Sequence, residues 1–165
     1  MGQNRAVGVR RAVRGLLVDP DGAVFLMRVV EPLSRRAFWV TPGGGIDGGE
    51  DHPTALRREL GEELGLDLPA ERIGAALWQR RVMLSWNGLH VEQHETYYLI
   101  ETERFEPTLC RDGDQDTDWV EAVPRWWTED DLRASDEYIA PVNLADLLAG
   151  LRRDGAPAHP FDITV

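Results

Sequence analysis

The chain has 165 residues, a mass of 18.6 kDa and a formal net charge of −11. Hydrophobic residues make up 42% and charged residues 28%, which excludes a disordered or fibrous chain and predicts a single domain over residues 1–165. The acidic excess disfavours binding to duplex nucleic acid, and no apolar run is long enough for a membrane span or a signal peptide. With one cysteine and no internal disulfide, we expect a cytoplasmic protein.

The first third of the chain predicts short strands and turns. A loose arm over residues 1–10 precedes a strand at 12–18. The sequence Asp-Pro-Asp-Gly at 19–22 is typical of a turn, and the returning strand at 23–30 makes a β-hairpin. A further short buried strand is expected at 38–40.

A glycine-dense loop at 41–50 leads into a helix predicted over 51–64. Asp51 can cap the N-terminus of this helix, Pro53 is tolerated in its first turn, and Gly65 suits the position after its last turn. The loop and the helix therefore form one continuous local unit.

The rest of the chain predicts a second hairpin and two helices. Asn87-Gly88 is a strong signal for a type I′ turn between strands. The predicted elements are strands at 77–86 and 89–101, a loop at 102–117, a strand at 119–127, helices at 129–134 and 142–153, and an irregular tail at 154–165. This alternation predicts an α+β fold in which a mixed sheet packs between helices.

The predicted helix 51–64 carries two kinds of side chain. Leucines at every fourth position form an apolar stripe for packing on the sheet. Glu59, Glu62 and Glu63 share an adjacent arc, where three carboxylates repel one another unless a cation lies between them. Carboxylate oxygens favour Mg²⁺ or Mn²⁺ as that cation. The alternatives are a solvated acidic face for the helix and a simple flexible turn for the loop.

Loop and helix together fit one spaced pattern, G-x5-E-x7-R-E-U-x-E-E-x-G-U, where U is aliphatic. The specified positions are filled by Gly44, Glu50, Arg58, Glu59, Leu60, Glu62, Glu63, Gly65 and Leu66. The segment resembles the Nudix box. The resemblance implies the Nudix fold, a mixed β-sheet sandwiched between α-helices. It also implies hydrolysis of a pyrophosphate bond in a nucleoside diphosphate linked to another moiety.

The resemblance further implies roles for box residues. Glu59, Glu62 and Glu63 would hold a divalent metal together with the Gly44 carbonyl. The pair formed by Arg58 and Glu50 would orient the box. A catalytic base can also come from outside the box, for which Glu121 is the first candidate and Asp118 the second, against the alternative of ordinary surface acids.

Substrate contacts outside the box are predicted from residue type alone. Trp39 and Trp78 are candidates for stacking on a nucleobase, although packing in the core is the alternative. Arg28 and Arg80 are candidates for gripping a diphosphate, although surface solvation is the alternative.

Several functions stay open at this point. The substrate can be a nucleoside triphosphate, a nucleotide sugar or a similar small molecule, because the marks typical of other Nudix subclasses are absent. A non-catalytic nucleotide-sensing module is the main alternative, although such modules usually lose box glutamates. An isomerase-type relative acting on a prenyl diphosphate fits less well, because Cys110 falls in a predicted acidic loop. A homodimer is possible by analogy with the family.

Overall fold

The computed structural model describes residues 8–108 and 123–165. The strands are β1 (Val9–Val18), β2 (Val24–Val30), β3 (Ala37–Val40), β4 (Gly43–Gly45), β5 (Ala76–Trp86), β6 (Leu89–Glu101), β7 (Val123–Trp127), β8 (Ile139–Ala140) and β9 (Phe161–Asp162). The helices are α1 (His52–Leu64), the short 3₁₀-helix η1 (Ala70–Arg72), α2 (Glu129–Ala134) and α3 (Leu144–Asp154). None of these helices is long and apolar enough to cross a bilayer.

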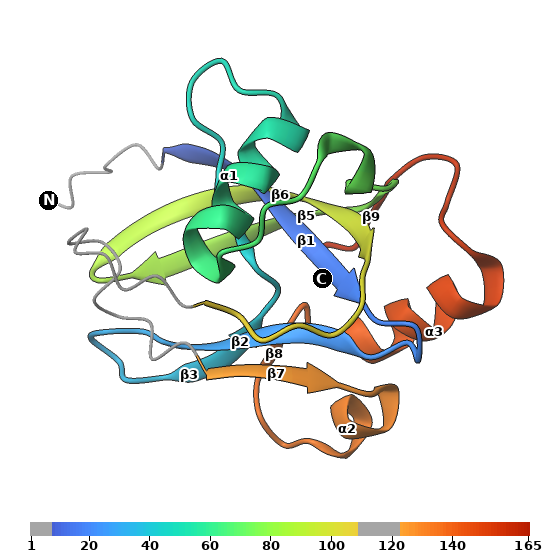
Figure 1. The fold of residues 1–165 in the computed structure, drawn as a ribbon. Helices are drawn as coiled ribbons and strands as arrows, with labels where there is room; N and C mark the ends of the chain where they lie inside the picture. Colours follow the sequence, from blue (N-terminus) through green and yellow to red (C-terminus); the bar gives the residue numbers. More distant parts are fainter. Residues whose placement is uncertain (1–7, 109–122) are drawn as a thin grey trace, which may run out of the picture.

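The strands form one curled, mixed sheet in the order β8-β3-β2-β1-β6-β5-β9, with β4 added to β1 and β7 to β2. Strands β1 and β6 run parallel along the whole of β1, whereas β1 and β2 pair only where Val18 meets Val24. The sheet therefore opens into two layers, with β1, β5 and β6 in one and β2, β3 and β7 in the other (Figure 1). The hairpin predicted over residues 12–30 is confirmed only at its turn.

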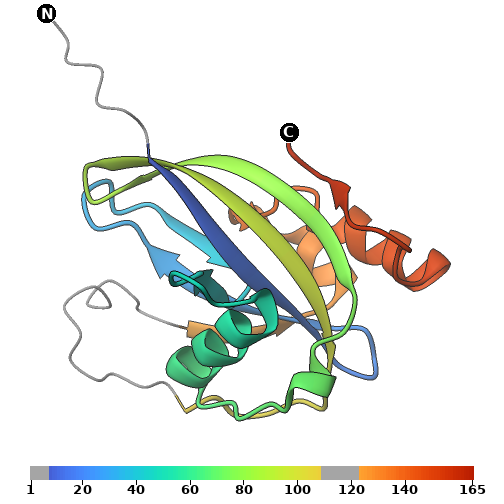
Figure 2. The same cartoon turned by 90° about the horizontal axis from the view of Figure 1, so that it is seen from above.

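Helices cover both faces of the sheet, as Figures 1 and 2 show. One apolar core lies under α1 and contains Val13, Leu17, Phe25, Met27, Ala55, Leu56, Leu60, Leu64 and Ile100. The other lies under α2 and α3 and contains Leu16, Trp39, Trp78, Tyr97, Trp127, Leu132, Leu144 and Leu148 among others. The predicted α+β class and the sheet between helices are confirmed.

The ends of α1 follow the predicted signals. The Asp51 carboxylate accepts a hydrogen bond from the Thr54 N–H at 2.8 Å, which satisfies a donor of the first turn. Gly65 has a left-handed backbone (φ 66°), and its N–H donates to the Gly61 carbonyl at 3.0 Å. The type I′ turn between β5 and β6 is also present, with positive φ at both Asn87 and Gly88.

Three expectations need correction. The glycine-rich loop contains a short strand, β4, because the backbone of Gly43–Gly45 pairs antiparallel with β1. The strand β1 begins at Val9 rather than at residue 12, since its parallel pairing with β6 starts at Val9. The tail is not wholly irregular, because β9 adds to the edge of β5 and buries Ile163.

Candidate active site

The strand β4 brings the glycine backbone against the acidic face of α1. A Cβ atom at Gly44 would lie 2.5 Å from the carboxyl carbon of Glu59, and one at Gly43 would lie 2.1 Å from the Val13 carbonyl oxygen. Only glycine permits this approach, since any larger residue would push the loop off the strand or displace the carboxylate. The loop backbone and the Glu59 carboxylate are thereby held in direct contact.

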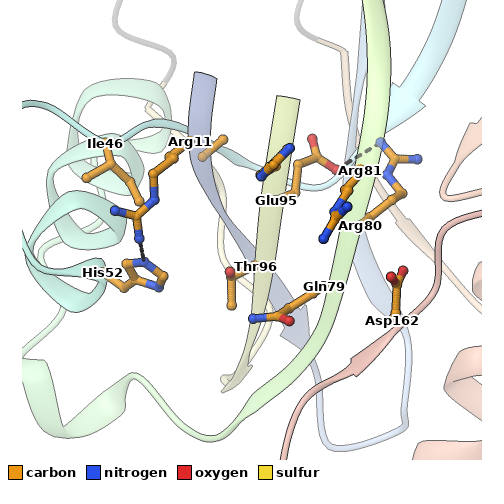
Figure 3. A pocket seen from close by; sticks show the side chains of 11 residues that line it. Arg11, Ile46, His52, Gln79, Arg80, Arg81, Glu95, Thr96 and Asp162 are labelled. Atoms are coloured by element: carbon orange, nitrogen blue, oxygen red, sulfur yellow. Dashed lines mark hydrogen bonds and ion pairs between the residues drawn. The ribbon is translucent and has the colours of Figure 1, made fainter. Parts of the chain in front are cut away.

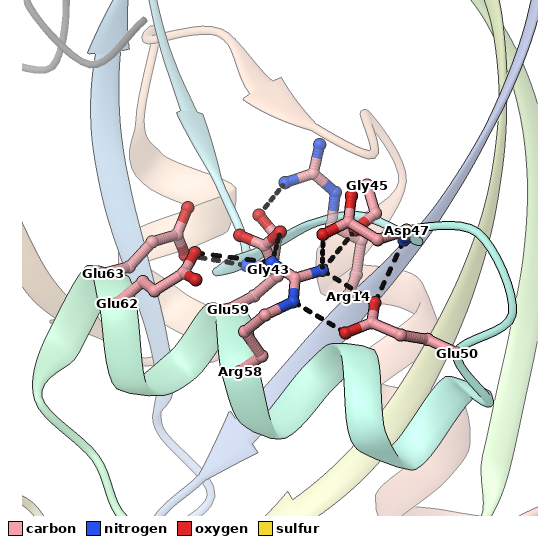
Figure 4. A network of polar contacts seen from close by, with 9 residues as sticks. All are labelled: Arg14, Gly43, Gly45, Asp47, Glu50, Arg58, Glu59, Glu62 and Glu63. Carbon is pink, nitrogen blue, oxygen red and sulfur yellow. Dashed lines mark hydrogen bonds and ion pairs between the residues drawn. The ribbon is translucent and has the colours of Figure 1, made fainter. Parts of the chain in front are cut away.

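Arg58 lies at the centre of the box network shown in Figure 4. Its Nε and Nη2 donate to the two carboxylate oxygens of Glu50 at 2.8 and 2.9 Å, and Nη2 also donates to the Gly45 carbonyl at 3.0 Å. This bidentate pair lowers the pKa of Glu50 to about 2. The predicted pairing of Arg58 with Glu50 is confirmed, and it ties the loop to the helix.

The third nitrogen of the same guanidinium faces two of the candidate metal ligands. Arg58 Nη1 donates to Glu59 Oε1 at 2.8 Å and contacts Glu62 Oε2 at 3.4 Å. The Glu59 pKa is raised by desolvation despite this contact, and the Glu62 side chain is largely exposed. Arg58 thus offsets part of the charge that gathers on this arc of α1.

The negative charge of Glu63 has fewer hydrogen bonds and ion pairs to offset it than that of Glu59. Its Oε2 accepts one hydrogen bond, from the Gly43 N–H at 2.9 Å, and no ion pair reaches it from the residues that the structure describes. Removal of the carboxyl group from water raises the Glu63 pKa to about 7, and the negative charges of Glu59 and Glu62 add to this rise. The site therefore presents carboxylates whose ionised forms lack full compensation.

These features fit a hard divalent cation. Its natural ligands are carboxylate and carbonyl oxygens, which Glu59, Glu62, Glu63 and the Gly44 backbone supply. The glycine cradle keeps the backbone beside Glu59, and Glu63 has oxygen lone pairs left unused. In the described parts of the chain, no three acidic, histidine or cysteine side chains already converge as a ready-made metal cluster. Reorientation of Glu62 and Glu59 away from Arg58 would complete the ligand set.

The candidate base platforms do not face a cavity. Trp39 and Trp78 are 4% and 2% exposed. Trp39 packs edge-on against Trp127 with ring centroids 4.9 Å apart, and Trp78 packs against Tyr97 at 5.8 Å. Because both rings belong to the core, neither tryptophan offers a face to a nucleobase. The prediction that they stack on the substrate is therefore wrong, and the alternative, packing in the core, is confirmed.

The two candidate phosphate-binding arginines are both engaged elsewhere. Arg28, on β2, lies 3.7 Å from the Glu137 carboxylate, and this pair includes no box residue. Arg80 Nε and Nη2 each lie 2.9 Å from Glu95 Oε2 in a largely buried ion pair. The structure therefore supports neither as a free cation for a diphosphate. Glu121 and Asp118 lie outside the described residues, and the base role of either stays a prediction.

A buried polar network beside the box was not predicted from the sequence. Glu95, which is 2% exposed, accepts hydrogen bonds from Arg14, Arg80, Gln93 and Tyr97 at 2.7–3.0 Å. Arg14 Nη1 in turn donates to the carbonyls of Thr41 and Gly43 at 3.3 Å. The one available signal was the alternation of Gln93, Glu95 and Tyr97, which places polar groups on the inner face of β6.

A cleft of about 640 Å³ opens above the box. Residues 45–50, Glu59, Arg10 and Arg11 line it. Arg10 Nη1 donates to the neutral Gln93 side chain at 3.1 Å, and the described residues offer it no ion pair. Arg10 was absent from the sequence-based candidates, yet its charge lies close enough to Glu59 to oppose the rise in the pKa of that carboxyl.

Comparison with known proteins fits this geometry. The sequence profile described as the NUDIX domain matches residues 8–147. An RNA pyrophosphohydrolase from Sphingopyxis alaskensis is 30% identical over 159 residues, which cover 86% of this chain and 89% of that protein. Nucleoside triphosphatase NudI from Salmonella heidelberg is 32% identical over 110 residues, covering 63% and 77%. A MutT protein from Methanosarcina mazei shares the fold, with a TM-score of 0.66 at 16% identity and coverage of 90% and 96%.

The chain belongs to the NUDIX domain family. Because the box is complete and the similar curated proteins are hydrolases, it is an enzyme of the pyrophosphohydrolase class within that family.

Proposed function

We propose that the chain hydrolyses, with a bound divalent metal, a pyrophosphate bond in a nucleoside 5′-triphosphate, either free or at the 5′ end of an RNA. The observation that carries the proposal is the undercompensated pair of carboxylates, Glu59 and Glu63, held against the Gly43–Gly44 backbone. The names of the similar RNA pyrophosphohydrolase and nucleoside triphosphatase support this substrate class.

The residues of the box have two different roles in this proposal. Glu59, Glu62, Glu63 and the Gly44 carbonyl would hold Mg²⁺ or Mn²⁺. Such an ion, when bound, neutralises charge on the phosphates and lowers the pKa of the attacking water. Arg58 keeps the loop and the helix in register through Glu50 and Gly45. The placement of the loop backbone beside α1 therefore rests on contacts within the protein.

Arg10 has a separate role in this proposal. Its guanidinium lines the same cleft as Glu59, and its hydrogen-bond partner among the described residues is the neutral Gln93 side chain. A guanidinium in this position can donate two parallel hydrogen bonds to phosphate oxygens. Arg10 would hold the triphosphate in place while charge develops at the scissile bond.

The test is a panel of nucleoside triphosphates, nucleotide sugars and a 5′-triphosphorylated oligonucleotide, assayed with Mg²⁺, with Mn²⁺ and with EDTA. We expect release of pyrophosphate or phosphate from triphosphate substrates, and loss of that activity in EDTA. The Glu63→Gln variant serves as the inactive control, and binding of Mn²⁺ followed by electron paramagnetic resonance checks the metal independently. Binding of nucleotides without turnover of any would point instead to a sensing module.

A further inference from the structure

A row of basic side chains crosses the outer face of the sheet next to the box. Arg11 on β1 is in register with His94 on β6, and His94 is in register with Arg81 on β5. Residues in register on adjacent strands point to the same face of a sheet. The row therefore places two permanent cations on either side of a histidine.

The row borders a small pocket, shown in Figure 3. Its volume is about 210 Å³, and hydrogen-bond donors gather around it. Gln79 and Thr96, in register with each other on β5 and β6, add an amide and a hydroxyl next to the row. His52, from the first turn of α1, closes the side nearest the box.

The two arginines keep their charge available. Arg11 Nη2 lies 3.2 Å from His52 Nε2, and burial together with Arg11 itself lowers the His52 pKa, so this partner is neutral. Arg81 forms no ion pair within residues 8–108 and 123–165. The pocket thus holds two cations that no carboxylate of the described residues contacts directly.

The nearby acids are engaged with other groups. Glu95 is shared between Arg14 and Arg80, and Glu92 Oε1 lies 2.6 Å from His94 Nε2. Asp162 lines the pocket and feels the charge of Arg81, but its Oδ1 accepts the Thr164 N–H at 2.7 Å. The charge of Asp162 therefore acts on Arg81 without a direct contact, and no carboxylate of the described residues forms an ion pair with Arg11.

We propose that this pocket binds a phosphate group, in addition to the phosphates cleaved at the box. Arg11 and Arg81 lie on either side of β6, and an anion held between them would offset the repulsion of their like charges. Guanidinium, hydroxyl and amide donors match the several oxygens of a phosphate. The proposal goes beyond the proposed function, because it assigns a second binding site that takes no part in bond cleavage.

The pocket adjoins the cleft over the box. Arg11 and Ile46 line both, so the two spaces are neighbours. The phosphate can therefore belong to a longer substrate, as its next phosphodiester, or be free in solution. Both sources present the same oxygens to the same donors.

The first measurement is an amide NMR titration of the whole protein with inorganic phosphate, in the absence of divalent metal. We expect shifts at Gln79, Arg81 and Thr96, and an affinity about tenfold weaker in Arg81→Gln, which loses one charge-assisted contact. Arg36→Gln removes the same charge from an exposed position between β2 and β3, and should bind phosphate as the wild type does. Arg81 is exposed, so the variant should fold, and its thermal unfolding checks this.

The second measurement compares KM for a 5′-triphosphorylated dinucleotide with KM for a nucleoside triphosphate. If the pocket takes the next phosphodiester, Arg81→Gln loses the preference for the dinucleotide. If that preference is unchanged while phosphate affinity falls, the pocket takes free phosphate. Absence of phosphate-induced shifts in the wild type, or shifts that persist unchanged in Arg81→Gln, would overturn the proposal. Because the titration needs no turnover, it stands even if the proposed function fails.

Discussion

Two carboxylates that lie close to the same loop have opposite electrostatic surroundings. Glu63 on α1 is desolvated with one N–H donor, and its pKa rises to about 7. Glu95 on β6 is more deeply buried, yet Arg14 and Arg80 hold its pKa near 2. Burial alone therefore does not decide whether a carboxylate stabilises this fold. Glu95 completes a structural network, whereas Glu63 retains capacity to bind a cation.

The same substitution should separate the two carboxylates, and the largest effect is expected at Glu95. Glu95→Gln leaves two guanidinium groups without their counter-charge and should lower the free energy of unfolding by about 4 kcal/mol, measured by urea denaturation at neutral pH. Glu71→Gln, at an exposed position, is the matched control and should change it by less than about 0.5 kcal/mol. Equal stability of the two variants would contradict the structural role.

The pH dependence of stability tests the same network. Because the folded pKa of Glu95 is about 2 and the ordinary value is 4.5, its ionised form stabilises the folded state above pH 4.5. That contribution should disappear as the pH falls from 4.5 to 2, and the Glu95→Gln variant should lack this component. Denaturant midpoints measured across this range for both proteins provide the check; parallel curves would show that Glu95 is not the group responsible.

At Glu63 the opposite result is expected. Glu63→Gln removes a carboxylate that the folded state desolvates and that the charge of Arg14 offsets only in part, so metal-free stability at pH 8 should rise by about 1 kcal/mol. Turnover with Mg²⁺ should fall about a hundredfold, since a proposed ligand is lost. Urea denaturation in EDTA and steady-state kinetics measure the two effects. If Glu63→Gln is less stable and turns over normally, Glu63 has a structural role like that of Glu95 and is not a metal ligand.

A smaller effect should follow from closing the glycine cradle. A Cβ at Gly44 would press on the Glu59 carboxylate, so Gly44→Ala should weaken Mn²⁺ binding about tenfold, as followed by electron paramagnetic resonance. Gly48→Ala lies in the same loop, where an added Cβ meets nothing within 4 Å, and should bind Mn²⁺ normally. Identical affinities would show that the close approach at Gly44 is not needed.

The smallest effect concerns the middle of α1. An added Cβ at Gly61 would meet only the Leu66 carbonyl oxygen, at 3.6 Å, so there is room for alanine. Gly61→Ala should raise the free energy of unfolding by up to about 1 kcal/mol through helix propensity. Thermal unfolding measures the gain, and unchanged kinetics would confirm that the helix supports the acidic arc without needing flexibility at this point.

Features that depend on contacts between residues near in the sequence could be predicted from the sequence. The box spacing, the Asp51 cap and the Gly65 end located α1 and its acidic arc, because those residues interact within a few turns of the chain. The Arg58–Glu50 pair followed from the family resemblance and is present.

Contacts between segments far apart in the chain could not be predicted from the sequence. Trp39 and Trp78 are as suited to a base platform as to a core, and only the packing of β3 and β5 against α3 and β7 shows that they are buried. The partnership of Glu95 with Arg14 depends on the parallel register of β1 and β6, which spans some eighty residues of chain. No pattern within either strand encodes that register.

The short strand β9 has a practical consequence. It covers the open edge of β5, where Ile163 N–H donates to the Gln79 carbonyl and the Thr164 hydroxyl accepts the Arg81 N–H. Trimming the chain before Phe161 would leave a row of unsatisfied backbone groups that can recruit a neighbouring molecule. Fusion partners and affinity tags for this enzyme are therefore better attached at the opposite terminus, which keeps the sheet margin closed against self-association.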